Sequence, residues 1–282
     1  MHARHLRTAL IAAALVVGLG ACSATGASGS GGASAGASGS STAASGSDQS
    51  LAKVKKAGVI TFGTEGTYKP FSYHADGSGD LTGFDVEVAR AIAGKLGVKA
   101  AFAETQWDAI FAGLDAGRFD AIANQVSITP ERQGKYEFST PYTVSTGVIV
   151  VKADNTSITS FDSLKGKTTA QSLTSNWYKL AQSSGADVQS VEGWAQSVAL
   201  VQQGRVDATI NDKLTYLDYV KTNGQSGLKI AAETTDKSKS AIALKKGATA
   251  LTEAIDTALQ QLSDDGTLAS ISQKYFGADV TK

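Results

Sequence analysis

The chain has 282 residues, with 26 basic and 26 acidic side chains and a single cysteine, Cys22. The balanced charge excludes a protein that binds nucleic acid through a basic surface, and the single cysteine excludes a disulfide within the chain. This length is sufficient for one large or two small domains.

The first 21 residues have the pattern of a signal peptide. Arg4 and Arg7 precede an uncharged run over residues 8–20, which is shorter than the ~20 residues that a helix needs to cross a bilayer. The run leads into Leu19-Gly20-Ala21-Cys22, which resembles a bacterial lipobox. The resemblance implies cleavage before Cys22 and a lipid anchor on this cysteine, at the extracytoplasmic face of the cell membrane. The alternative is an unrelated cysteine near a signal peptide.

Residues 22–50 are predicted to be a lipid-anchored linker. From Ser23 to Ser50 the segment contains almost only Ser, Gly, Ala and Thr, with Asp48 as its single charge. Such a composition buries too little apolar surface to offset the entropy of ordering, so we expect a flexible tether before a folded body that begins at Leu51. No later segment is long and apolar enough to span a membrane.

The body alternates short apolar strands with amphipathic helices, a pattern that predicts an α/β fold. Apolar residues at helical spacing predict helices around residues 84–96, 251–262 and 268–276. The predicted strands cover residues 59–63, 98–103, 147–152, 168–171 and 241–244.

The body contains an internal repeat at an offset of 87 residues. Residues 107–124 read WDAIFAGLDAGRFDAIAN, and residues 194–211 read WAQSVALVQQGRVDATIN. Each copy predicts a helix that ends at a glycine, Gly117 or Gly204, and then a short strand, which covers residues 119–123 in the first copy. Two such units predict two lobes, each a sheet flanked by helices. The alternative is a chance similarity of two ordinary helix–glycine–strand units.

The repeat also predicts a cleft. Ligands of open α/β sheets bind beyond the carboxyl ends of the strands, so Asn124 and Asn211 should face a shared cleft. If the second copy belongs to a lobe inserted into the first, the chain crosses twice, near residues 143–146 and 237–240. We therefore expect lobe 1 to comprise residues 51–143 and 240–282, lobe 2 to comprise residues 144–239, and a two-strand hinge to let them close on a ligand.

Two opposite charges follow the repeated strands, Arg132 in the first lobe and Asp212 in the second. A zwitterionic amino acid requires a donor for its carboxylate and an acceptor for its ammonium group, because an unpaired buried charge is costly. Arg132 and Asp212 meet that need. Arg132 could instead pair with Glu131 at the surface, and Asp212 could instead cap a helix that starts at Lys213.

Five sequence blocks together resemble the polar amino-acid-binding proteins of ABC importers. These blocks are residues 65–71, 83–87, 128–132, 138–142 and 164–167. The resemblance covers the body from Lys53 onward and implies a two-lobed periplasmic-binding-protein-like fold. It also implies a small amino acid as ligand and ABC permease subunits as partners; we expect a monomer.

The resemblance implies a role for individual residues. They are Arg132 and Ser127 for the ligand carboxylate, Asp212 for its ammonium group, Tyr68 and Trp107 around its side chain, and Ser175 and Asn176 in the loop that closes over it. The sequence departs from the family pattern at Glu65, where a shorter aspartate is usual, and at Thr174, in a loop that is usually richer in glycine.

Finer matches resemble the cystine-binding proteins in particular. They lie in residues 63–68, 124–127, 135–145 and 275–282. A ligand with two amino-acid ends needs further polar partners, and Glu65, Gln125 and Asn124 are candidates.

The competing functions are a sensor or binding module for another polar amino acid, and a dehydratase-like enzyme of the same fold. After removal of the signal peptide His74 is the only histidine, and it lies in a polar stretch. Glu65 beside a ligand ammonium group would stay ionised rather than act as a general acid. We therefore expect no enzyme, no cofactor and, without a His/Cys cluster, no metal site.

Overall fold

The computed structural model describes residues 48–224 and 227–282. The predicted signal peptide, the lipidation site Cys22 and most of the linker therefore lie outside the described residues. The folded body begins earlier than the expected Leu51, because the Asp48 carboxylate accepts a hydrogen bond from the backbone N–H of Ala250. Helix α1 (Ser50–Ala57) follows directly.

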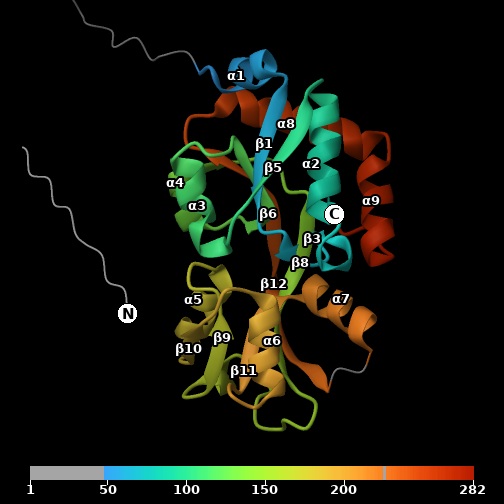
Figure 1. The fold of residues 1–282 in the computed structure, drawn as a ribbon. Helices are drawn as coiled ribbons and strands as arrows, with labels where there is room; N and C mark the ends of the chain where they lie inside the picture. The colour runs from blue at the N-terminus through green and yellow to red at the C-terminus, as the bar shows by residue number, and fades with distance from the viewer. Residues whose placement is uncertain (1–47, 225–226) are drawn as a thin grey trace, which may run out of the picture. The chain divides into compact units, whose positions relative to one another are not determined.

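The described elements form two α/β lobes, which the long strands β8 (Thr143–Lys152) and β12 (Leu228–Lys245) connect (Figure 1). Besides α1, the first lobe contains β1 Val59–Thr64, β2 Thr67–Tyr68, β3 Ser72–His74, β4 Leu81–Thr82, α2 Phe84–Lys95, β5 Lys99–Glu104, α3 Trp107–Asp115, β6 Ala121–Ser127, α4 Pro130–Lys135, β7 Tyr136–Phe138, α8 Thr249–Asp264 and α9 Thr267–Phe276. The second contains β9 Thr168–Gln171, α5 Asn176–Ser183, β10 Asp187–Ser190, α6 Trp194–Gln202, β11 Ala208–Asp212 and α7 Lys213–Asn223.

One sheet runs through both lobes in the order β10-β9-β11-β8-β12-β6-β1-β5, with β7 also paired to β12. The strands β5, β1 and β6 are parallel, as are β10, β9 and β11. Parallel strands are covered on both faces, and accordingly no residue of β1 is exposed. Their carboxyl ends in the two lobes are the places where ligands bind in open α/β sheets.

The two segments in which the chain was predicted to cross between the lobes lie side by side. Thr143 pairs with Ser240 and Thr146 with Lys237 in the antiparallel ladder of β8 and β12. Both strands run unbroken through these pairs, so the lobe boundaries at residues 143/144 and 239/240 stay a prediction.

The two copies of the repeat have the same structure. Gly117 and Gly204 end α3 and α6 with φ angles of 72° and 68°, a left-handed conformation that glycine adopts without strain. The Asp120 carboxylate accepts from the backbone N–H of Thr61 at 2.9 Å, and Asp207 accepts from Thr168 at 2.8 Å. The repeat is therefore a structural one.

The bounds of three strands differ from the predicted ones. β6 starts at Ala121 rather than at residue 119 and continues to Ser127, so Asn124 lies inside the strand and not after it. β8 begins four residues before the predicted Gly147. The middle of β12, residues 233–240, is polar and shows no apolar run, and it is part of the strand because it pairs with β8.

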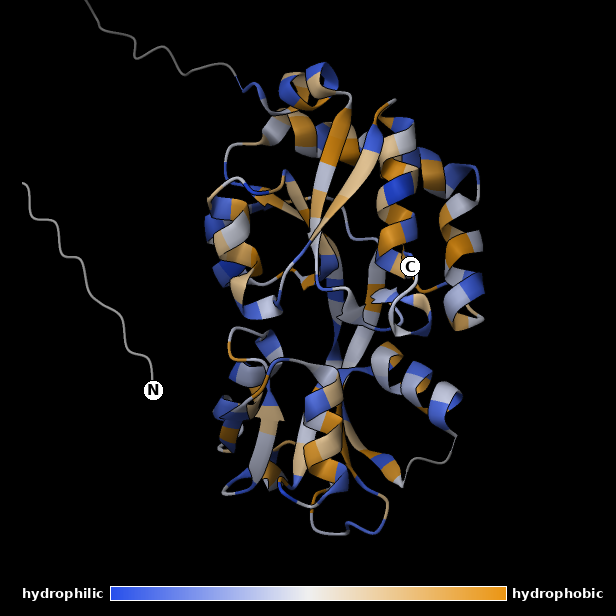
Figure 2. Ribbon diagram, in the orientation of Figure 1, coloured by the Kyte–Doolittle hydropathy of each residue, from blue (hydrophilic) through white to orange (hydrophobic). Residues whose placement is uncertain are grey.

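Apolar side chains form a core in each lobe, and Leu214 of α7 packs with the core of the first. Phe62, Ile92 and Ile255 belong to the core of the first lobe, and Ile149 and Leu164 to that of the second. Figure 2 shows β1 and β5 as largely hydrophobic strands beside helices that alternate hydrophobic and hydrophilic residues. Among the described residues, none of the helices has the length and hydropathy of a membrane span.

Two glycines of α2 should respond to alanine in opposite ways. Gly83 has a φ of 127°, and a Cβ there would lie 2.2 Å from the carbonyl oxygen of Phe71, so Gly83→Ala should lower the free energy of unfolding by about 2–4 kcal/mol. Gly94 has open space around it, and Gly94→Ala should raise that free energy by about 0.5–1 kcal/mol. Urea unfolding measures both. Equal effects would contradict the strained conformation at residue 83.

Candidate functional site

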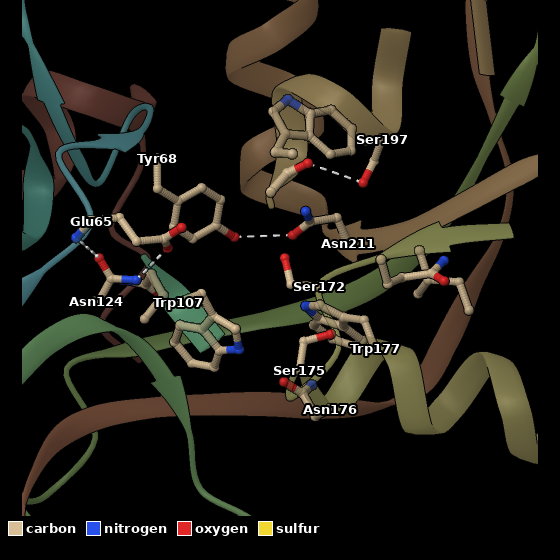
Figure 3. Close-up of a pocket in the computed structure, with 15 residues that line it drawn as sticks. Glu65, Tyr68, Trp107, Asn124, Ser172, Ser175, Asn176, Trp177, Ser197 and Asn211 are labelled. Atoms are coloured by element: carbon tan, nitrogen blue, oxygen red, sulfur yellow. Dashed lines mark hydrogen bonds between the residues drawn. The ribbon is translucent and has the colours of Figure 1, made fainter. Parts of the chain in front are cut away.

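A cavity lies between the lobes at the carboxyl ends of β1, β6, β9 and β11 (Figure 3). The first lobe lines it with Glu65, Tyr68, Trp107, Asn124 and Gln125. The second lobe lines it with Gln171, Ser172, Ser175, Asn176, Trp177, Gly193, Trp194, Ser197, Ile210 and Asn211. Asn124 and Asn211 thus face a shared cleft, as the repeat predicts. The cavity volume of about 60 Å³ is below the ~300 Å³ at which pockets for small ligands begin, so a ligand requires the lobes to separate.

Asn124 fixes the carboxylate of Glu65 on the first-lobe wall. Its Oδ1 accepts from the Thr64 hydroxyl at 3.0 Å and from the Glu65 backbone N–H at 2.9 Å, and its Nδ2 donates to Glu65 Oε2 at 2.6 Å. Burial raises the pKa of Glu65 to about 7, although the hydrogen bond from Asn124 opposes this shift. Glu65 has no ion pair among the described residues, so the carboxylate can accept a cationic group.

Tyr68 connects the two lobes. Its hydroxyl donates to Asn211 Oδ1 at 3.0 Å (Figure 3). It also lies 3.0 Å from the Thr215 hydroxyl on α7. Burial raises the pKa of Tyr68 well above its usual range, so the phenol stays neutral.

Three buried polar atoms of the lining residues have no hydrogen-bond partner in the described part of the chain. They are Trp107 Nε1, Gln125 Oε1 and Gln171 Nε2. Each such atom costs about 1–3 kcal/mol when nothing satisfies it. The cavity therefore offers two unused donors and one unused acceptor to a polar ligand.

The guanidinium of Arg132 lies against the ring of Trp107. This guanidinium donates to the carbonyl oxygens of Ser127 at 3.0 Å and Thr174 at 3.3 Å, and lies 5.2 Å from the ring centre of Trp107. Burial lowers its pKa to about 10, which leaves it charged at neutral pH. Arg132 lines a second cavity of about 610 Å³, which shares Asn176 with the first. Arg132 has no ion pair among the described residues; the surface alternative is wrong, because Glu131 pairs with Lys135 and Lys179.

Asp212 is buried at the start of α7. Its Oδ1 accepts from the Ser145 hydroxyl at 2.7 Å and from the backbone N–H of Leu214 at 2.9 Å, which confirms the helix-cap alternative. Burial raises its pKa to about 6.

In this structure Arg132 and Asp212 do not line one cavity, and their joint binding of a zwitterion stays a prediction. Neither residue lines the cavity between the lobes, and Ser127 does not line it either. The physical reason is that neutral partners already occupy both charges: the guanidinium binds two carbonyl oxygens, and the carboxylate caps its own helix. The other predicted residues, Glu65, Tyr68, Trp107, Asn124, Gln125, Ser175 and Asn176, do line it.

Thr174 binds the first lobe with all of its polar atoms. Its backbone N–H and its hydroxyl donate to Asp108 Oδ1 at 2.9 and 2.8 Å, and its carbonyl oxygen accepts from Arg132. The next residue, Ser175, caps α5 through the backbone N–H of Tyr178. The departure from a glycine-rich loop therefore supplies a contact between the lobes.

The sequence analysis missed seven residues of the cavity, namely Gln171, Ser172, Trp177, Gly193, Trp194, Ser197 and Ile210. Trp194 is the repeat partner of Trp107, and this alignment could have identified it. Gln171 ends a correctly predicted strand, and Ser172 follows it. Trp177 on α5 had no pattern that distinguished it from a core residue.

The comparisons with known proteins agree on one family. The profile of the bacterial extracellular solute-binding proteins, family 3, matches residues 60–278. The L-cystine-binding protein TcyA of Bacillus subtilis is 52% identical over 231 residues, 82% of this chain and 86% of that protein.

Two solved structures show the same fold. The L-cystine solute receptor of Neisseria gonorrhoeae, in its unliganded open conformation, is 46% identical with a TM-score of 0.57, over 82% of this chain and 99% of the receptor. An ancestral arginine-binding protein bound to arginine is 38% identical with a TM-score of 0.73, over 78% of this chain and 99% of that protein.

The stability of the ligand-free protein should fall as the pH rises from about 5 to about 8. Burial raises the pKa of Glu65 and Asp85 to about 7 and that of Asp212 to about 6. Since unfolded carboxyls titrate near pH 4, the folded state binds more protons between about pH 4 and 7, and this contribution is lost as the pH passes the folded pKa values. Urea unfolding at several pH values measures the slope. Glu65→Gln should make the slope shallower; an unchanged slope would contradict the shift at Glu65.

Proposed function

The chain belongs to family 3 of the bacterial extracellular solute-binding proteins, and on this basis we propose that it binds L-cystine outside the cytoplasm and delivers it to an ABC importer. One observation carries the ligand chemistry: Glu65, which lines the cavity with Trp107, and the buried Arg132, which lies against the Trp107 ring, are opposite charges without an ion pair among the described residues. A ligand with ammonium and carboxylate groups supplies both missing partners.

The number of polar partners that the protein offers matches L-cystine better than it matches a ligand with one amino-acid end. Its two zwitterionic ends carry four charged groups. Glu65 and Asp212 are carboxylates for the ammonium groups, and Arg132 is the guanidinium for a carboxylate. Unused donors on Trp107 and Gln171 remain for the other carboxylate. The 52% identity to an L-cystine-binding protein supports this ligand.

The ligand carboxylate would replace the carbonyl of Thr174 at the Arg132 guanidinium. In this structure the carbonyl oxygens of Thr174 and Ser127 are the hydrogen-bond acceptors of Arg132. A carboxylate is a stronger partner for a guanidinium than a neutral carbonyl, and it binds in a bidentate geometry. The exchange lets the lobes open and close without leaving the guanidinium unpaired.

The lobes of this structure stand in a closed arrangement. The fold superposes better on the arginine-bound relative than on the open receptor, although the receptor is more similar in sequence. The small cavity and the contacts of Tyr68 and Thr174 across the cleft fit the same arrangement. Ligand entry therefore proceeds through hinge opening at β8 and β12.

The proposed position outside the cytoplasm goes with a membrane anchor for this protein and with the importer's permease subunits as its partners. Cys22 carries the lipid anchor, residues 23–47 tether the body to the membrane, and the permease subunits of the importer receive the ligand from a monomer. These residues lie outside the described part of the chain, and the lipobox-like sequence supports the anchor.

The second candidate is an arginine-binding or arginine-sensing protein. The arginine-bound relative favours it, since the buried Glu65 carboxylate suits a guanidinium as well as an ammonium group. A dehydratase-like enzyme has less support. The described lining residues include no histidine, cysteine or lysine, and His74 instead contacts Glu104.

A ligand screen tests the proposal. L-cystine at a hundredfold excess over its Kd should stabilise the protein by about 2.7 kcal/mol in a thermal-shift assay, more than any single amino acid at the same concentration. Arg132→Ala should weaken cystine binding by about 2–5 kcal/mol in calorimetry, because it removes the partner of a buried carboxylate. Arg205→Ala, at an exposed arginine, is the control and should bind normally. A larger shift with L-arginine would favour the second candidate.

The contact between Thr174 and Asp108 should slow ligand release. Thr174→Val keeps the side-chain shape but removes the hydroxyl that donates to Asp108, so the dissociation rate should rise up to about tenfold. Thr174→Ser keeps the hydroxyl and should behave like the natural protein. Stopped-flow fluorescence measures the rates. If the valine and serine variants release ligand equally fast, this contact does not hold the lobes together.

A further inference from the structure

Gln125 lines the cavity in an unusual backbone conformation. Its φ angle is +50°, and Asp76 is the other non-glycine residue with a positive φ in the described chain. Bulky side chains rarely adopt this conformation, which is strained and persists only when the surroundings hold it. The groups that hold the Gln125 backbone in this conformation therefore also determine how its side chain lines the cavity.

Asp85, at the start of α2, holds Gln125 at two points. Its Oδ2 accepts from the backbone N–H of Gln125 and its Oδ1 accepts from Gln125 Nε2, both at 2.7 Å. The Thr143 hydroxyl accepts the second hydrogen of Nε2 at 3.1 Å. Asp85 is fully buried and does not line the cavity. Thr143 is the first residue of β8, so the same contacts link the cavity to the hinge strand.

These contacts determine which way the Gln125 amide faces. Rotating the amide by 180° would place its oxygen against the Asp85 carboxylate, and two acceptors repel each other. Nε2 therefore stays on Asp85 and Thr143. Oε1, which has no partner in the described protein, remains as the one unused acceptor among the buried side-chain atoms of the cavity. A buried acceptor needs a donor, and an ammonium group provides one.

We propose that Asp85 is a positioning residue that holds Gln125 Oε1 as the acceptor for an ammonium group of the ligand. The inference rests on the proposed function, because it assumes an amino-acid ligand. Asp85 itself touches no ligand. It acts by fixing the amide, and its buried negative charge adds a favourable field for a nearby cation. Asp85 and Gln125 thus select ligands that carry an ammonium group.

The test compares two ligands that differ only in their ammonium groups. L-cystine and 3,3′-dithiodipropionate, which is cystine without both ammonium groups, are titrated by calorimetry into the natural protein and two variants. Asp85→Asn keeps the shape but gives residue 85 a donor, so the Gln125 amide can rotate. Gln125→Met leaves Asp85 in place and removes the acceptor.

Both variants should weaken cystine binding by about 10- to 100-fold, as expected for the loss of a hydrogen bond to a charged group. The Kd of dithiodipropionate should change by less than about threefold. The double variant should be no weaker than either single variant, because both remove the same interaction. Urea unfolding checks that each variant is folded, and Gln125→Met decides the question if Asp85→Asn is not.

A structural role of Asp85 alone would weaken both ligands equally, and that result would overturn the proposal. An unchanged affinity of Gln125→Met for cystine would overturn it as well. If the natural protein does not bind cystine, the proposed ligand is wrong, and L-arginine with 5-guanidinopentanoate, which is arginine without its ammonium group, replaces the pair. The same differential loss would then support the role of Asp85.

Discussion

Buried charge without a counter-charge is the constraint on which this site depends. Asp85, Arg132 and Asp212 are buried, Glu65 is partly buried, and none of the four has an ion pair in the described chain. Neutral donors and acceptors reduce the cost of each charge but do not cancel it. Under the proposed function, a zwitterion between the lobes supplies charges of both signs, so that ligand binding and lobe closure would stabilise each other.

The internal repeat explains how the cavity is built. Each copy delivers a tryptophan at the start of a helix and an asparagine near the end of a strand, so Trp107, Trp194, Asn124 and Asn211 meet from opposite lobes. The two asparagines nevertheless make different hydrogen bonds. Asn124 orients the Glu65 carboxylate, whereas Asn211 accepts the hydroxyl of Tyr68 from the other lobe. The same repeated unit therefore positions the Glu65 carboxylate in the first lobe and the contact of Asn211 with Tyr68 between the lobes.

Polar contacts at the rim of the cleft keep closure reversible. Tyr68 binds Asn211 and Thr215, and Asp108 binds Thr174, whereas each lobe has its own apolar core, with Leu214 of α7 as the buried apolar residue of the second lobe that joins the core of the first. Hydrogen bonds exchange with water at little net free energy, so such an interface can open without exposing a large apolar surface. The antiparallel pairing of β8 with β12 holds the lobes together while these contacts break.

The sequence by itself determined the α/β lobes, the repeat and the cleft facing Asn124 and Asn211, because apolar periodicity and turn glycines act over a few residues. Lining residues such as Tyr68 and Ser175 came from the resemblance to the family. Only the tertiary structure decided the polar middle of β12, the lining by Trp177 and the partners of the charges. Arg132 and Asp212 have the right charges for a zwitterion, yet Thr174 and Ser145, which occupy them, are 42 and 67 residues distant in the chain. Hydrogen bonds between such distant residues depend on how the lobes pack, and no local pattern encodes that packing.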